Sequence, residues 1–327
     1  MKIPAGMALA ALLAASGSAH ADAPQVLTTL KPLQLIAAAI TDGVSAPELL
    51  VAPGASPHDY ALKPSDSRKL ASADLLVWVG PDMEAFVARS AEQKKPEQLL
   101  TLAEVLNLKE RGKEEDHDEH HDEHADHEDH DHDEHADHDG HDDHEEEAEE
   151  GHHHHHGGYN PHMWTSPEFA VEAAHALADR LRELDPEHAE RYVENYKTFE
   201  EAVNAEDAKI KAELAPVKST GYFVFHDAYH YFEEHYALNH LGEFTVNPER
   251  QPGAKHLAEI RHELEEGKAR CVFTEPQFVP AVVESITHGL NVKQAALDPL
   301  ATDIPVSAQG YVHFLDDIAG RFKSCLQ

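Results

Sequence analysis

The chain contains a tract made almost entirely of side chains that bind divalent metal ions. Residues 117–141 read HDEHHDEHADHEDHDHDEHADHDGH, and GHHHHHGG follows at 151–158. Imidazole and carboxylate groups are common zinc ligands in proteins, so the tract predicts zinc binding. It holds 16 of the 29 histidines of the chain: His117, His120, His121, His124, His127, His130, His132, His135, His138, His141, His144, His152, His153, His154, His155 and His156.

The composition of this tract argues against one well-shaped site within it. High charge and very few apolar residues predict a segment that is disordered without metal. The sequence DEHADH occurs at 122–127 and again at 133–138, which is typical of low-complexity expansion. Ordering such a chain around an ion costs about 1–2 kcal/mol per residue. We therefore interpret the tract as an accessory, low-affinity zinc binder, with a dispensable solvated linker as the alternative.

Three other histidines stand at or near the ends of predicted strands. His58 lies in the loop PGASPHDY after ELLVA, His162 lies in NPHMW before a capped helix, and His226 ends GYFVF. In open α/β sheets, ligands bind outside the carboxyl ends of the strands. We expect these histidines to converge on one cleft. Three neutral imidazoles and a water form a common tetrahedral zinc site.

The remaining candidate ligands have weaker support. Asp298, in LDPLATD after the last strand, is a possible fourth ligand, or an acceptor for an imidazole N–H. Its alternative role is to cap the following turn. Glu275, in FTEPQF, occupies an analogous strand end and ranks below Asp298. His230 follows His226 by four residues, the spacing of two ligands on one helix face. We expect His226 to end a strand and Asp227 to cap the next helix, so His230 has weaker support as a ligand.

The elements that must position these residues predict an α/β protein of two lobes with mainly parallel sheets flanked by helices. Four strand-then-helix patterns precede the helical middle of the chain and four follow it. We place the first lobe at 22–185, with the loop 113–158 inserted, and the second at 217–327. A long rigid helix at 186–216 joins them, because 187–214 contains no Gly or Pro.

The first 21 residues have the pattern of a secretory signal peptide. Lys2 supplies the positive charge, GMALAALLAAS is a short apolar run, and Ala19-x-Ala21 is a cleavage pattern. No later stretch approaches the roughly 20 apolar residues that cross a bilayer. We expect an exported protein that is soluble and not membrane-embedded.

Charge and cysteine content limit the possible partners further. The whole acidic region, residues 114–158, contains 22 Asp and Glu and no Lys or Arg, so it accounts for 22 of the 36 net negative charges. The sequence has no basic patch of the kind that binds nucleic acids. The only cysteines, Cys271 and Cys325, most simply pair in an oxidising compartment. Two thiolate metal ligands are the alternative, although the pair lacks C-x-x-C spacing.

Six segments in order resemble one family of binding proteins. These are PGASPHDYALKPSD, NPHMWTSPE, FHDAYHYFE, FTVNPERQPGA, CVFTEPQF and LDPLATDI. They resemble the ZnuA family, the periplasmic zinc-binding members of the cluster A-I solute-binding proteins. The resemblance covers nearly all of the chain after the signal peptide.

The resemblance implies a monomeric periplasmic protein that carries one Zn²⁺ to an ABC permease and its ATPase, and that is not an enzyme. It implies His58, His162 and His226 as the zinc ligands and supports the cysteine pairing. Manganese-binding relatives have Glu at the position of His226. Some zinc members have a Glu ligand where this chain has Pro57, which leaves the fourth position to water or Asp298. Some also have a second-site His where this chain has Glu243.

Two other functions share parts of this pattern. An exported zinc hydrolase or lyase would also use three histidines and a water, whose pKa zinc lowers to about 7. Asp59 and Asp227 adjoin ligands, but nothing in the sequence marks either as a general base. A metal-storage chaperone would use the tract itself and would bind many ions weakly.

Overall fold

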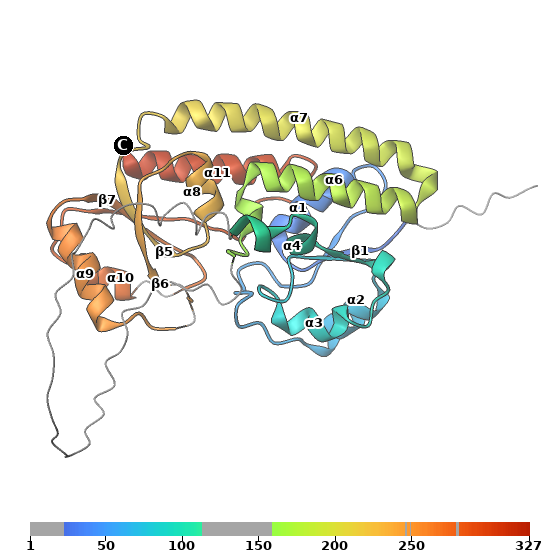
Figure 1. Cartoon of the computed structure of the whole chain (residues 1–327), viewed down its shortest axis with the longest axis horizontal. Coiled ribbons are helices and arrows are strands. Elements are labelled where there is room, and N and C mark those ends of the chain that lie inside the picture. The colour runs from blue at the N-terminus through green and yellow to red at the C-terminus, as the bar shows by residue number, and fades with distance from the viewer. Residues whose placement is uncertain (1–22, 113–158, 246, 249, 279–280) are drawn as a thin grey trace, which may run out of the picture.

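The computed structural model describes residues 23–112, 159–245, 247–248, 250–278 and 281–327. The predicted signal peptide and the histidine tract, with its sixteen histidines, lie outside the described residues. Within them, two four-stranded parallel sheets are each flanked by helices, which confirms the predicted fold class (Figure 1).

The first sheet has the strand order β2-β1-β3-β4, with every neighbouring pair parallel. Its two inner strands read VLT and LLVW and are buried throughout, as parallel strands covered on both faces must be. The strands are β1 Val26–Thr28, β2 Glu48–Leu49, β3 Leu75–Trp78 and β4 Leu99–Thr101, and the helices are α1 Lys31–Ile40, α2 Pro64–Ser72, α3 Ala85–Ala91 and α4 Leu102–Val105.

The second sheet repeats this order as β6-β5-β7-β8, again wholly parallel. In both sheets the order reverses beside the first strand, between β1 and β3 and between β5 and β7. Such a reversal opens a crevice at the carboxyl ends of the two strands. The strands are β5 Gly221–His226, β6 His240–Thr245, β7 Ala269–Thr274 and β8 Lys293–Ala296, and the helices are α8 His230–His235, α9 Ala254–Glu265, α10 Ala281–Thr287 and α11 Gly310–Leu326.

Long helices form a layer that runs along both sheets (Figure 1). Helix α6, Pro167–Leu184, begins as predicted, with the Ser166 hydroxyl accepting the Phe169 N–H. Helix α7, Ala189–Leu214, has 26 residues and packs on α6 and α11. It starts three residues after the predicted start at 186, because Pro186–His188 forms a separate 3-10 turn, and it ends two residues before the predicted end at 216.

The two sheets are connected by one continuous hydrophobic core that includes α1 and α11. These helices approach so closely that a Cβ on Gly310 would lie 2.8 Å from Leu35 Cδ2. Trp164 Nε1 donates to the carbonyl of Pro299 at 2.7 Å, and the Tyr311 hydroxyl donates to the carbonyl of Trp164 at 2.8 Å. Apolar packing and directed hydrogen bonds therefore both connect the two halves in this structure.

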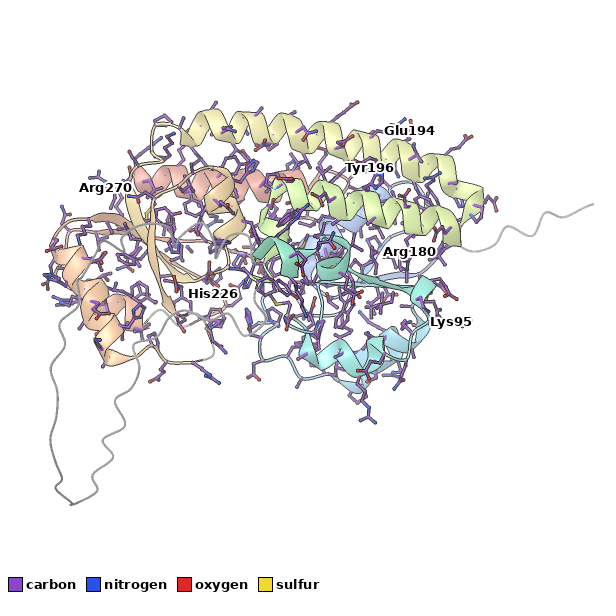
Figure 2. The ribbon with its side chains drawn as sticks, viewed as in Figure 1. Lys95, Arg180, Glu194, Tyr196, His226 and Arg270 are labelled. Atoms are coloured by element: carbon purple, nitrogen blue, oxygen red, sulfur yellow. A yellow bond between two sulfur atoms is a disulfide. The ribbon has the colours of Figure 1, made fainter. Side chains whose placement is uncertain are left out.

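Two side chains illustrate how α6 is attached to the first sheet. Arg180 donates through Nη1 to the carbonyls of Pro96 and Leu99, both at 2.7 Å, next to the start of β4 (Figure 2). Arg111 forms an ion pair with Glu172 at 3.0 Å. No helix in the described ranges is long and apolar enough to cross a membrane.

A disulfide joins Cys271 of β7 to Cys325 of α11, with a Cα–Cα distance of 5.9 Å. Both residues are buried. The predicted pairing is confirmed, and the alternative of two thiolate ligands is excluded because both sulfurs are used in the bond. The bond fixes the end of the chain to a central strand of the second sheet.

Replacing both cysteines by alanine should lower the free energy of unfolding by about 4 kcal/mol. The bond closes a loop with a sequence separation of 54 residues, and its loss restores the chain entropy of the unfolded state. Urea denaturation of the oxidised protein, the reduced protein and the double variant measures this. Equal stability of the oxidised protein and the double variant would contradict the expectation.

Candidate metal site

Three histidines from separate parts of the chain meet between the two sheets. His226 is the last residue of β5 (Figure 2). His162 directly precedes the short 3-10 turn Met163–Thr165, which leads into α6. His58 lies in the loop between β2 and α2. The predicted convergence at the carboxyl ends of the strands is what the structure has.

The three imidazole rings are close enough to bind one ion. Ligand atoms of His58, His162 and His226 all lie within 4.8 Å of one another. The ring centroids of His162 and His226 are 5.1 Å apart, and each is 5.5 Å from that of His58. This is the one such group of three or more potential ligands among the described residues.

One nitrogen–nitrogen distance already matches tetrahedral zinc. The Nε2 atoms of His162 and His226 are 3.4 Å apart. Zinc–nitrogen bonds of 2.0–2.1 Å in a tetrahedral arrangement place two nitrogens about 3.3–3.4 Å apart. Two of the three candidate ligands therefore already have the separation that zinc requires.

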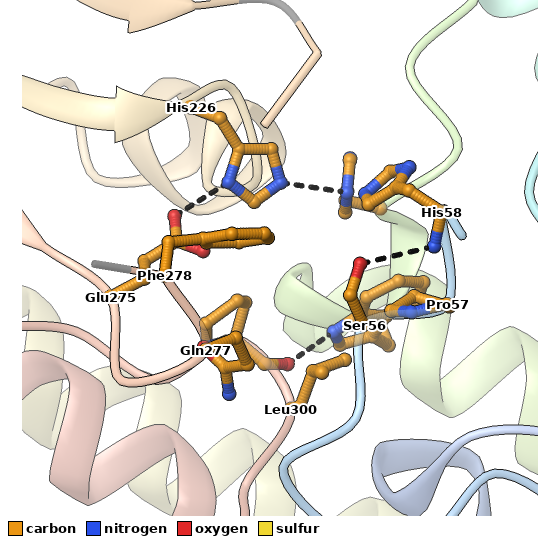
Figure 3. A pocket seen from close by; sticks show the side chains of 11 residues that line it. Ser56, Pro57, His58, His226, Glu275, Gln277, Phe278 and Leu300 are labelled. Carbon is orange, nitrogen blue, oxygen red and sulfur yellow. Dashed lines mark hydrogen bonds and ion pairs between the residues drawn. The ribbon is translucent and has the colours of Figure 1, made fainter. Parts of the chain in front are cut away.

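Glu275 orients the imidazole of His226. Its Oε1 lies 2.6 Å from Nδ1 of His226, and the side chains are 1% and 3% exposed (Figure 3). A carboxylate can only accept, so Nδ1 carries the hydrogen and the Nε2 lone pair faces the other rings. Burial raises the pKa of Glu275, and the contact with His226 opposes that rise. Such a carboxylate–histidine pair makes the imidazole a stronger metal ligand.

Asn160 orients the imidazole of His162 in the same way, as an acceptor for its Nδ1–H. Its Oδ1 lies 2.7 Å from Nδ1 of His162 and accepts the His162 backbone N–H at 3.0 Å. Sequence reasoning did not identify this residue. The dipeptide Asn160-Pro161 is nevertheless a turn signal, and an Asn side chain in such a turn accepts the N–H two residues later.

His58 reaches the cluster from a loop that is held by short polar contacts. Its backbone N–H donates to the Ser56 hydroxyl, and Asp66 at the start of α2 accepts from the Tyr60 hydroxyl and the Lys63 N–H. Burial, aided by the neighbouring His226, lowers the pKa of His58 to about 3. This ring is therefore neutral at ordinary pH, as a metal ligand must be.

The cavity at the cluster is small and mostly apolar. The space that a water-sized sphere can occupy there is about 10 Å³, close to the minimum for a single water. Figure 3 shows His58, His226, Glu275 and Gln277 together with the apolar side chains of Pro57, Phe278 and Leu300. Besides the three histidines, Glu275 and Gln277, the lining residues are Ser56, Pro57, Trp164, Phe278, Pro299 and Leu300.

Asp298, the sequence candidate for fourth ligand or imidazole acceptor, makes different contacts. Its Oδ2 accepts the Thr302 N–H at 2.6 Å, and its Oδ1 accepts from Gln277 at 2.6 Å and from the Leu300 N–H at 3.1 Å. It thus shapes the turn that lines the cavity, which was the alternative role. Glu275, which ranked below it, is the carboxylate that contacts a histidine of the cluster, His226.

The expected cap of the helix after β5 is wrong. Helix α8 begins at His230, and Asp227 is not its cap. Instead, Asp227 accepts two hydrogen bonds at 2.9 Å from the amide of Asn160. His230 lies outside the three-histidine group. Glu243, at the second-site position of some relatives, lies 3.9 Å from His240 Nε2.

Comparison with known proteins agrees with this site. The family model described as zinc-uptake complex component A, periplasmic, matches residues 26–325. The high-affinity zinc uptake system protein ZnuA of Yersinia pestis is 44% identical over 92% of this chain and 91% of its own length. The protein of that name from Haemophilus influenzae is 45% identical over 97% and 96%.

A solved structure has the same fold. The crystal structure of a ZnuA deletion mutant with zinc bound matches this structure with a TM-score of 0.71 and 20% sequence identity. The match covers 94% of this chain and 99% of that chain. The family model and the curated relatives, each spanning nearly the whole chain, lead to one assignment. This chain belongs to the ZnuA family of zinc-uptake components.

Proposed function

We propose that this protein captures Zn²⁺ through His58, His162 and His226 and delivers it to the permease of an ABC importer, which an ATPase drives. The single observation that carries the proposal is the cluster of three imidazoles between two lobes. Two of the rings present Nε2 atoms 3.4 Å apart, with an acceptor behind each Nδ1. Water is the proposed fourth ligand, because the Asp298 oxygens accept other hydrogen bonds.

The dimensions of the site support binding and not turnover. A space of about 10 Å³ is far too small to hold an organic substrate beside a bound ion. Among the described residues that line the cavity, Glu275 is the one carboxylate, and its Oε1 is paired with Nδ1 of His226. Together with the family, this makes the protein a binding component and not a zinc hydrolase or lyase.

We also propose that the protein works as a monomer in the periplasm after removal of residues 1–21. Support comes from the signal-like composition of that segment, the disulfide and the periplasmic description of the family. The histidine tract is proposed as an accessory binder that raises the local zinc concentration. Its support is its composition alone.

Two sets of variants test the assignment of the tight site. Replacing the sixteen tract histidines by asparagine should leave one tightly bound zinc per chain and remove additional weak ions. In that background, alanine at His58, His162 or His226 should weaken zinc binding by more than the roughly 10–100-fold that loss of an outer-shell partner costs. Isothermal titration with a competing chelator measures both.

The matched control is His175→Ala, because His175 is a solvent-exposed histidine on α6 outside the cluster. It should bind zinc like the parent protein. Retention of one tight ion in all three cluster variants would contradict the ligand assignment. An unchanged zinc stoichiometry after replacement of the tract histidines would contradict the accessory role.

The lowered pKa of His58 predicts a pH dependence of the metal-free protein. The unfolded chain takes up a proton at His58 near pH 6.5, whereas the folded chain does so only near pH 3. The unfolded state therefore binds more protons between these values, so stability falls as pH falls from 6.5 towards 3. His58→Gln, which cannot titrate, should lose less stability over that range.

Urea denaturation of the metal-free parent and of His58→Gln at pH 4, 5, 6 and 7 measures the difference. The buried Glu84 and Glu233, whose pKa values burial raises to about 7, act in the opposite sense in both proteins and cancel in the comparison. A stability difference between parent and variant that stays constant with pH would contradict the expectation.

A further inference from the structure

The side chain of Asn160 links the candidate ligand His162 to the residue that follows the candidate ligand His226. Its Oδ1 accepts from the backbone and from Nδ1 of His162. Its Nδ2 donates to the carbonyl oxygen and to Oδ2 of Asp227, both at 2.9 Å. Asp227 is the residue directly after His226. Asn160 itself is 5% exposed, so these contacts are made away from solvent.

The surroundings of this amide permit only one orientation. Both atoms that Nδ2 meets are acceptors, and the backbone group that Oδ1 meets is a donor. A flipped amide would place its NH₂ against the His162 N–H and its oxygen against the carbonyl of Asp227. The contacts with Asp227 therefore hold Oδ1 towards His162, and an Oδ1 there requires the hydrogen of the imidazole on Nδ1.

Neighbouring residues attach this segment to opposite halves of the molecule. The Tyr159 hydroxyl donates to Asp82 at 2.7 Å, in the loop after β3 of the first sheet. The Tyr231 hydroxyl, from α8 beside the second sheet, donates to the backbone carbonyl of Asn160 at 2.6 Å. Consecutive residues thus contact the first half and the second half, and Asn160 is the one held by the second.

We propose that Asn160 is a positioning residue that sets the tautomer of His162 only while the second lobe holds its amide. The proposal rests on the zinc function above and names what regulates that site. When the lobes are in contact, Asp227 and Tyr231 fix Asn160, and His162 presents the Nε2 lone pair to the ion. When they separate, the amide loses these partners, and His162 is free to place its hydrogen on Nε2 and lose a ligand atom.

The coupling acts in both directions. Zinc on Nε2 draws electron density from the ring and makes Nδ1–H a better donor to Asn160. Linked hydrogen bonds polarise one another, so the amide then donates more strongly to Asp227. Zinc binding therefore strengthens the contact between the lobes, and by linkage that contact strengthens zinc binding equally.

The test compares variants that remove different parts of this chain of contacts. Asn160→Ala removes the whole connection. Asp227→Ala removes one acceptor in the second lobe and touches nothing on the His162 ring. Tyr231→Phe removes only the hydrogen bond to the Asn160 backbone. Asp207→Asn is the matched control, because it neutralises a carboxylate paired with His235 on α8 at 2.7 Å, outside the site.

The first measurement needs no zinc. Long-range proton–nitrogen NMR spectra of the metal-free protein report which nitrogen of His162 carries the hydrogen, with His162→Gln identifying the signals. We expect the Nδ1–H form in the parent and in Asp207→Asn. We expect a shift towards the Nε2–H form in Asp227→Ala and a smaller one in Tyr231→Phe. An unchanged tautomer in both would overturn the proposal.

The second measurement is zinc affinity in the tract-substituted background. Asn160→Ala should weaken binding by roughly 10–100-fold, as loss of an outer-shell partner does. Asp227→Ala should weaken it in the parent and have little further effect in Asn160→Ala. Strictly additive losses, or Asn160→Ala binding within about twofold of the parent, would overturn the proposal.

The two ideas fail in different ways. If the parent with the substituted tract binds no tight zinc, the proposed function fails, whatever the NMR spectra show. If it binds one zinc tightly and the tautomer of His162 is unchanged in Asp227→Ala and Tyr231→Phe, only the proposed role of Asn160 fails. Should Asn160→Ala not fold, the NMR comparison of Asp227→Ala and Tyr231→Phe still decides the proposal.

Discussion

The site depends on one requirement, which is that three imidazoles must stay neutral and present a chosen nitrogen to the same point. A ring in water exchanges its hydrogen between two nitrogens and takes up a proton near pH 6.5. Here burial removes the charged form of His58, and hydrogen-bond acceptors select the tautomer of the other two rings. The strand ends and loops of the two halves bring these three rings and their acceptors together.

The strand order of the second sheet places His226 and its acceptor next to each other. The order reverses between β5 and β7, so the residues that end these strands lie side by side at one crevice. His226 ends β5, and Glu275 directly follows β7. His226 and its acceptor therefore come from neighbouring strands of one sheet, while the opposite half contributes His58 from a loop. The shared core through α1 and α11 holds the two halves in register.

Much of this could be predicted from the sequence, because the predictions relied on local patterns. Alternating strands and helices gave the fold class, and His58, His162 and His226 were recognisable because each lies at or near the end of a strand or the start of a helix. The choice between Glu275 and Asp298 could not be made, because it depends on strand order. Glu275 follows β7, next to β5, whereas Asp298 lies beyond β8, one strand further out. Neighbouring strands lie about 5 Å apart, so Asp298 follows a strand that is about one strand spacing further from β5 than the strand before Glu275.

The residues that line the cavity also disfavour the binding of calcium and magnesium. Calcium and magnesium require six or more oxygen ligands or retained waters, and magnesium gives up its water reluctantly. Among the described residues, this cavity offers three imidazoles beside Pro57, Trp164, Phe278 and Leu300. Its oxygen groups are Ser56, Gln277 and Glu275, and Glu275 is paired with His226. A hard cation entering it would lose its hydration shell and would meet fewer oxygen ligands than the six or more that it requires. The site can therefore favour a scarce, borderline-soft metal such as zinc in a medium rich in calcium and magnesium.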